Sequence, residues 1–169
     1  MRILGIDPGI GITGYGLIET NGDDIELITC GSIQTDKNKT VSERLLEINK
    51  DMKELLKKLK PDEAGIEQLF FFKNQKTIIP VAQARGVILT VLEEMGVKIG
   101  EYTPLVVKQT MTGHGRATKE EVHSMVRRYV DIDKYTKLDD TVDAVAIAIC
   151  HSRNIEAGAC FGKNWFNLF

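Results

Sequence analysis

The chain has 169 residues, of which 43% are hydrophobic and 27% are charged. This length suits one globular domain with a sizeable core and is too short for two, and no run of 18 apolar residues occurs, so no membrane span is expected. The net charge of −2 by itself argues against a nucleic-acid partner, but residues 73–128 hold nine Lys or Arg against five Glu, so one face can still bind phosphate.

The cysteines and the first residues bear on the compartment. Cys30, Cys150 and Cys160 are odd in number and lack metal-ligand spacing, which is typical of a reduced, cytoplasmic protein. The opening MRILGIDPG lacks the features of a secretory signal. We expect one folded domain over residues 1–157, followed by an aromatic, unpatterned tail over residues 158–169.

Three strands are predicted in the first 35 residues. RILGID is apolar and ends at Pro8-Gly9, TGYGLIET alternates and ends at Asn21-Gly22, and IELITCGSIQT follows. Asn-Gly is a strong signal for a tight hairpin turn. Short strands joined by tight turns predict an antiparallel meander.

Helices and strands then alternate. Residues 42–60 have apolar side chains at helical spacing, with Ser42 as the expected N-cap and Pro61 as the stop. EAGIEQLF predicts a fourth strand, and residues 75–95 predict a second helix whose start is left open by Pro80. This order predicts a mixed α/β sheet.

The last third of the chain predicts one more strand and two helices. VKIGEYTPLVVKQ is interpreted as a fifth strand followed by a loop, and MTGHGRA as a glycine-punctuated loop. Thr118 and Glu121 match a capping box that opens a helix through about Val130. A final helix, DDTVDAVAIAICHSRN, opens at Asp139 or Asp140.

Two carboxylates stand on strands that should be buried. Asp7 ends the apolar first strand, where a buried carboxylate is costly, and Glu67 points to the face opposite Ile66 and Gln68. If the two strands are neighbours, these carboxylates repel unless a cation or proton lies between them. The alternatives are an aspartate that caps a turn and a solvent-facing glutamate.

A second pair, Asp140 and Asp143, lies within one turn of the last helix. Because this helix is otherwise apolar, it should pack on the sheet and bring both aspartates to it. The alternative is an ordinary helix start, in which such residues cap the backbone and favour the helix dipole, and Asp139 can be the cap instead. Four oxygen donors without a Cys or His set suit Mg²⁺ or Mn²⁺, and a two-metal site of this kind catalyses phosphoryl displacement.

Six motifs span nearly the whole chain: GIDPG at 5–9, TGYG at 13–16, AGIEQLFFFKN at 64–74, AQARG at 82–86, VKQTMTGHG at 107–115 and DDTVDAVAIAICH at 139–151. In these motifs and their order the chain resembles the RuvC family, the bacterial crossover junction endodeoxyribonucleases that resolve Holliday junctions. Some members carry His where Asp140 stands, and the tail after Cys160 matches no motif of the family.

The resemblance implies a ribonuclease H-like fold, with a five-stranded mixed sheet of three antiparallel and then parallel strands flanked by helices. It implies catalysis by Asp7, Glu67, Asp140 and Asp143 with two Mg²⁺ per active site, for which Mn²⁺ is a possible substitute. It also implies a homodimer that nicks two opposed strands of four-way junction DNA in recombination, repair and the SOS response. The branch-migration proteins RuvA and RuvB are the implied partners. A two-fold protein suits a two-fold substrate.

Basic residues near the carboxylates are candidates for DNA contacts. Lys108 and Lys119 match basic positions that the family uses near its active site, where each would neutralise phosphate or the charge that builds up during displacement. Weaker candidates for contact with the DNA backbone are Lys73, Lys76 and Arg116. The alternative for each is a solvated surface side chain.

Aromatic and histidine residues complete the candidate set. Phe70 matches a family aromatic that stacks on bases or wedges between them at the crossover, whereas core or dimer packing is the alternative for Phe70, Phe71 and Phe72. His114 and His123 are interpreted as surface residues.

Three other functions are alternatives for this sequence. The strand ending in DPG, followed by TGYG, also resembles the phosphate loop of actin-like ATPases, but those need two such domains. A catalytically silent DNA-binding or scaffold protein would have lost a carboxylate, and all four are present. Against a small nuclease that acts on RNA, the basic and aromatic segments 70–76 and 107–119 favour the junction enzyme.

Overall fold

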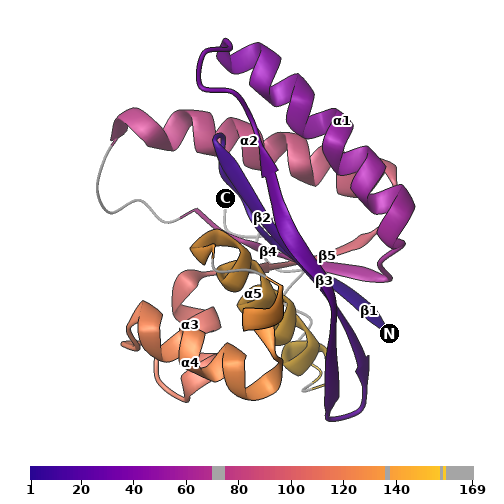
Figure 1. Ribbon diagram of the computed structural model, residues 1–169, viewed down its shortest axis with the longest axis vertical. Coiled ribbons are helices and arrows are strands. Elements are labelled where there is room, and N and C mark those ends of the chain that lie inside the picture. The colour runs from indigo at the N-terminus through magenta and orange to yellow at the C-terminus, as the bar shows by residue number, and fades with distance from the viewer. Residues whose placement is uncertain (70–74, 136–137, 157, 159–169) are drawn as a thin grey trace, which may run out of the picture.

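A five-stranded sheet with helices on both faces forms the centre of the molecule (Figure 1). The computed structural model describes residues 1–69, 75–135, 138–156 and 158. The sheet order is β3-β2-β1-β4-β5, with antiparallel pairs among the first three strands and parallel pairs from β1 through β4 to β5. This confirms the predicted ribonuclease H-like arrangement. The strands are β1 (Arg2–Asp7), β2 (Ile12–Asn21), β3 (Asp24–Gln34), β4 (Glu63–Glu67) and β5 (Lys98–Tyr102).

Helices α1 (Val41–Leu59) and α2 (Gln75–Glu94) cover one face of the sheet. Ile6 and Ile66 are fully buried beneath them. The predicted N-cap of α1 was wrong: Thr40, not Ser42, caps the helix, and its hydroxyl accepts from the Glu43 N–H while the Glu43 carboxylate accepts from the Thr40 N–H. A capping box needs an acidic partner three residues further along the chain, and of Thr40 and Ser42 only Thr40 has one.

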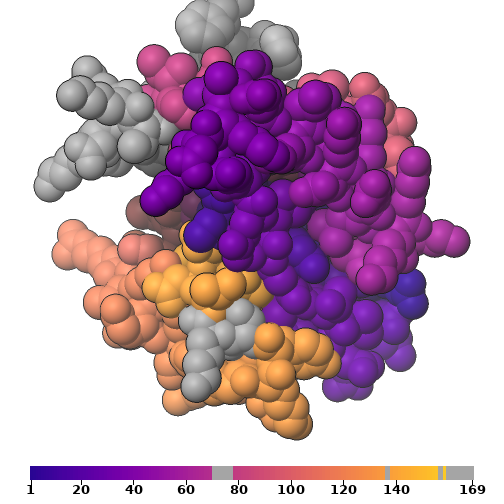
Figure 2. All heavy atoms as spheres, turned by 45° about the horizontal axis from the view of Figure 1, so that its top comes forward, coloured from indigo at the N-terminus to yellow at the C-terminus, as the bar shows by residue number. Residues whose placement is uncertain are grey.

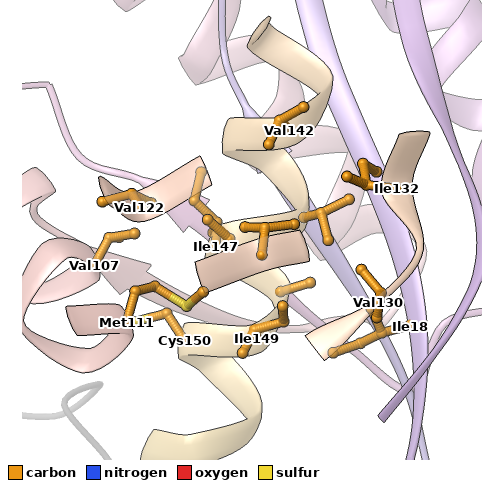
Figure 3. Close-up of a cluster of buried hydrophobic side chains, with 14 of the residues drawn as sticks. Ile18, Val107, Met111, Val122, Val130, Ile132, Val142, Ile147, Ile149 and Cys150 are labelled. Atoms are coloured by element: carbon orange, nitrogen blue, oxygen red, sulfur yellow. The ribbon is translucent and has the colours of Figure 1, made fainter. Parts of the chain in front are cut away.

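The other face carries α3 (Pro104–Thr112), α4 (Lys119–Tyr129), a short 3₁₀ turn (Ile132–Lys134) and α5 (Asp139–Glu156). Figure 3 shows their apolar side chains pointing toward one another. The loop predicted after the fifth strand is instead α3. Thr103 caps it and Pro104 occupies its first turn, where the missing N–H of proline costs nothing.

Glycines let α5 approach β1 and β2 closely. A Cβ atom at Gly5 would lie 1.9 Å from the carbonyl oxygen of Ala144, and one at Gly14 would lie 2.0 Å from that of Asp140. Any other residue would therefore push α5 away from the sheet. Figure 2 shows the orange residues of the C-terminal helices against the indigo and purple residues of the first strands.

Within the described ranges, none of the helices has the length and apolar character needed to cross a membrane.

Candidate active site

Asp7 and Glu67 are neighbours at the carboxyl ends of two parallel strands. Ile6 of β1 lies opposite Ile66 of β4, so the residues that follow them are adjacent. Since side chains alternate along a strand and both isoleucines point toward α1 and α2, the two carboxylates point toward α5. Both are half-buried, so Glu67 is not a solvent-facing glutamate.

The charges of the other three predicted carboxylates act on Asp7. Burial, followed by the charges of Glu67, Asp143 and Asp140, raises the pKa of Asp7 to about 8. Burial and the charge of Asp143 raise the pKa of Glu67 to about 7, although Lys119 and Lys108 act to lower it. Burial is the largest cause of both pKa shifts, and the neighbouring carboxylates add to it. The end of the sheet therefore holds an excess of negative charge.

Asp143 is bound by two cationic or polar side chains of α4. Its Oδ2 lies 2.7 Å from Nζ of Lys119, and its Oδ1 accepts a hydrogen bond of 2.7 Å from Nε2 of His123. Lys119 also lies 3.5 Å from Oδ2 of the exposed Asp139, the first residue of α5. Burial acts to lower the pKa of Lys119, but its contacts with Asp143 and Asp139 raise it overall.

The prediction that His123 is a surface residue was wrong. Its side chain is only 10% exposed and contacts a carboxylate of the site. The available signal was its spacing, because His123 follows Lys119 by four residues and the two therefore share a helix face. His114, in the loop between α3 and α4, is exposed as predicted.

A cavity of about 250 Å³ opens beside the carboxylates, between β4 and the three helices. Its polar wall is formed by Glu67, Lys108, Lys119 and Asp143. Its apolar wall comes from α3, α4 and α5 and is formed by Pro104, Val107, Val122, Ala146 and Ile147. The two predicted lysines thus lie together at the carboxylates, whereas Arg116 is exposed in the loop between α3 and α4.

Comparison with known proteins identifies the family. The family model for crossover junction endodeoxyribonuclease RuvC matches residues 3–151. The chain belongs to the RuvC family. A relative of the same description from Halothermothrix orenii is 45% identical over 162 residues, which cover 96% of this chain and 98% of the relative.

Solved structures agree with this assignment. The structure of Thermus thermophilus RuvC in complex with a Holliday junction substrate superposes with a TM-score of 0.87 at 32% identity, covering 94% of this chain and 97% of that one. The yeast mitochondrial Holliday junction resolvase, with a TM-score of 0.65 at 12% identity, shares the fold alone. The match over residues 3–151, together with the likeness to a solved RuvC, favours a junction endonuclease over the actin-like and RNA-directed alternatives.

Several predicted DNA contacts of this RuvC-family chain lie outside the described residues. These are Phe70 and Lys73, and the neighbouring Phe71 and Phe72 also lie outside the described part. Lys76 belongs to α2, but its side chain is also outside the described part, as is almost all of the tail from residue 158. Arg127, in the last turn of α4, pairs with Asp133 at 3.2 Å.

Arg85, in the AQARG motif of the family, was missed as a site residue. Its Nε donates to the backbone carbonyl of Glu67 at 2.9 Å, and its guanidinium pairs with Glu101 of β5. The backbone N–H of Gln68 donates to the carbonyl of Tyr102 at 2.8 Å. Together these bonds fix the end of β4 from which Glu67 projects. In the sequence, Arg85 is one basic residue on a predicted helix, and no local pattern indicates this role.

The donor set fits a hard divalent cation chemically. All four carboxylates offer oxygen atoms as ligands, and the raised pKa values of Asp7 and Glu67 come from burial and then from neighbouring negative charge, which a cation would balance. Within the described residues, however, no three or more His, Cys, Asp or Glu side chains are already grouped to hold a metal. Both oxygens of Asp143 contact other side chains, Oδ2 that of Lys119 and Oδ1 that of His123.

Proposed function

We propose that this chain is a divalent-metal-dependent endodeoxyribonuclease that resolves Holliday junctions as a homodimer. The observation that carries the proposal is the convergence of four carboxylates beside two lysines at one end of the sheet. The Thermus thermophilus relative, solved with a Holliday junction substrate, supports four-way DNA as the substrate class. The carboxylates and lysines are Asp7, Glu67, Asp140, Asp143, Lys108 and Lys119.

The four carboxylates would hold Mg²⁺, two ions per site, with Mn²⁺ as a substitute. When bound, such ions activate water and stabilise the leaving oxygen of a phosphodiester. Lys108 and Lys119 bind phosphate oxygens, offset the repulsion between phosphate and the acidic cluster, and orient the scissile group. Lys119 exchanges its contact with Asp143 for one with phosphate. The apolar wall of the cavity limits water access on the side away from the carboxylates.

The assembly follows from the symmetry of the substrate. The described residues of one protomer form one such carboxylate site, so paired nicks in opposed strands need two copies related by a two-fold axis. RuvA and RuvB, which move the branch point, are the proposed partners, and the cytoplasm is the proposed compartment. We assign nuclease activity to residues 1–157 and leave the tail, residues 158–169, without a catalytic role.

The test compares cleavage of a mobile four-way junction, a linear duplex and an RNA–DNA hybrid, with Mg²⁺, with Mn²⁺ and with EDTA. We expect symmetric nicks in the junction alone, and only with metal. Asp7→Asn should abolish cleavage while a gel shift still detects junction binding, because the carboxylates hold metal and the lysines hold DNA. Asp51→Asn, which changes an exposed carboxylate on α1, is the matched control. Full cleavage by Asp7→Asn would overturn the proposal.

A further inference from the structure

We propose that His123 is a positioning residue that sets the orientation of Asp143 toward the metal. The inference rests on the proposed function, in which Asp143 is a metal ligand. It assigns a role to a buried side chain that contacts the cluster without belonging to the four carboxylates.

The contact between His123 and Asp143 is short and partly buried. Nε2 of His123 lies 2.7 Å from Oδ1 of Asp143, and the exposed fractions of the two side chains are 10% and 28%. A carboxylate accepts hydrogen bonds and cannot donate them when ionised, so Nε2 carries the proton. A hydrogen bond to a charged acceptor is about twice as strong as a neutral one. The imidazole therefore restrains one oxygen of Asp143.

The two partners of Asp143 differ in how firmly they are held. Lys119 has a long, flexible side chain that is 47% exposed, and phosphate competes for its ammonium group. His123 has a rigid ring with few rotamers, and it is buried beside Val122 and Val126, which are themselves in the core. When Lys119 turns to phosphate, His123 keeps its contact. The orientation of Asp143 is thus set by the histidine.

The backbone that presents His123 is itself anchored. Thr118 and Glu121 form a capping box at the start of α4, with bonds of 2.7 Å and 3.2 Å. One turn later His123 faces Asp143, which projects from the second turn of α5. Side chains that orient a metal ligand from behind typically change metal affinity or activity about 10- to 100-fold when they are replaced.

Three substitutions of His123 separate positioning from packing. His123→Gln places an amide N–H at about the reach of Nε2, His123→Asn falls short of Asp143, and His123→Leu keeps bulk without a donor. We expect His123→Asn and His123→Leu to raise the Kd for Mn²⁺, measured by electron paramagnetic resonance, about 10- to 100-fold, and to lower kcat on the junction. His123→Gln should bind Mn²⁺ within a few-fold of the wild type. Junction binding in EDTA should not change in any of them.

Two further variants make the outcome decisive. Arg127→Leu, one turn along α4 and paired with Asp133, is the matched control and should leave Mn²⁺ affinity unchanged. Asp143→Asn tests the site itself. If Asp143→Asn weakens Mn²⁺ binding but His123→Asn and His123→Leu do not, the role of His123 is refuted and the metal site stands. If Asp143→Asn leaves Mn²⁺ binding intact, the proposed metal site fails.

Discussion

Asp7→Asn is expected to make the folded protein more stable while it removes the proposed activity. Asp7 sits at the end of a buried strand, where burial and three neighbouring carboxylates raise its pKa to about 8 from an ordinary value of 3.8. Between these pH values the folded state retains a proton that the unfolded chain has released. The wild type therefore loses stability as the pH rises from about 4 to about 8, and asparagine, which does not titrate, escapes this loss.

The size of the effect follows from the pKa difference. Each pKa unit corresponds to about 1.4 kcal/mol, so at pH 7 the carboxyl of Asp7 destabilises the fold by about 4 kcal/mol. Desolvation of the asparagine amide offsets about 1–2 kcal/mol of the gain. The expected increase in the free energy of unfolding is about 2–3 kcal/mol at pH 7, and it falls close to zero at pH 5.

Urea denaturation of both proteins in EDTA, at pH 5, 6, 7 and 8, measures this directly. The exposed Asp51→Asn is the control and should change stability by less than about 0.5 kcal/mol. Adding Mg²⁺ should stabilise the wild type by mass action and stabilise Asp7→Asn much less. An Asp7→Asn protein that is less stable at pH 7, or whose gain is the same at pH 5 and pH 8, would refute the electrostatic reasoning.

Three more substitutions test the surroundings of the site. Gly5→Ala should lower the free energy of unfolding, measured by urea denaturation, by about 4 kcal/mol or more, because its Cβ would overlap the backbone of α5. Gly86→Ala is the control and should be neutral or stabilising, because the space around Gly86 is open. Equal effects of the two substitutions would contradict the close approach of α5. Lys119→Ala should slow junction cleavage on the order of 10- to 100-fold and lessen the dependence of cleavage on salt. An unchanged rate would show that Lys119 is a solvated surface residue without a role in cleavage. His151→Leu should lower the free energy of unfolding by about 2–4 kcal/mol. It removes two hydrogen bonds, one of 2.8 Å between Nδ1 of His151 and the Tyr102 hydroxyl and one of 3.1 Å between Nε2 of His151 and the Glu63 carboxylate. Wild-type stability of this variant would show that these bonds contribute little.

Local patterns were enough for most of the fold. Alternation and apolar runs identify the strands, and helical spacing with a capping box at Thr118 identifies α4. Local chemistry misled where two signals competed. Ser42 and Thr40 both offer a hydroxyl, and the segment after the fifth strand contains both a proline and β-branched residues that suit a loop or a strand. The helix α3 forms there because its apolar side packs against α5.

The amino-acid sequence alone was enough to predict which residues would carry the proposed chemistry. A carboxylate at the end of an apolar strand and two aspartates at the start of an apolar helix cost free energy when they are buried, unless they bind a cation together. That cost can be recognised from the sequence pattern. How these groups are held became visible only in the folded chain. Asp143 pairs with Lys119 and His123, and Arg85 bonds to Glu67. These contacts join segments that are far apart along the chain, and separation along the chain does not predict distance in space.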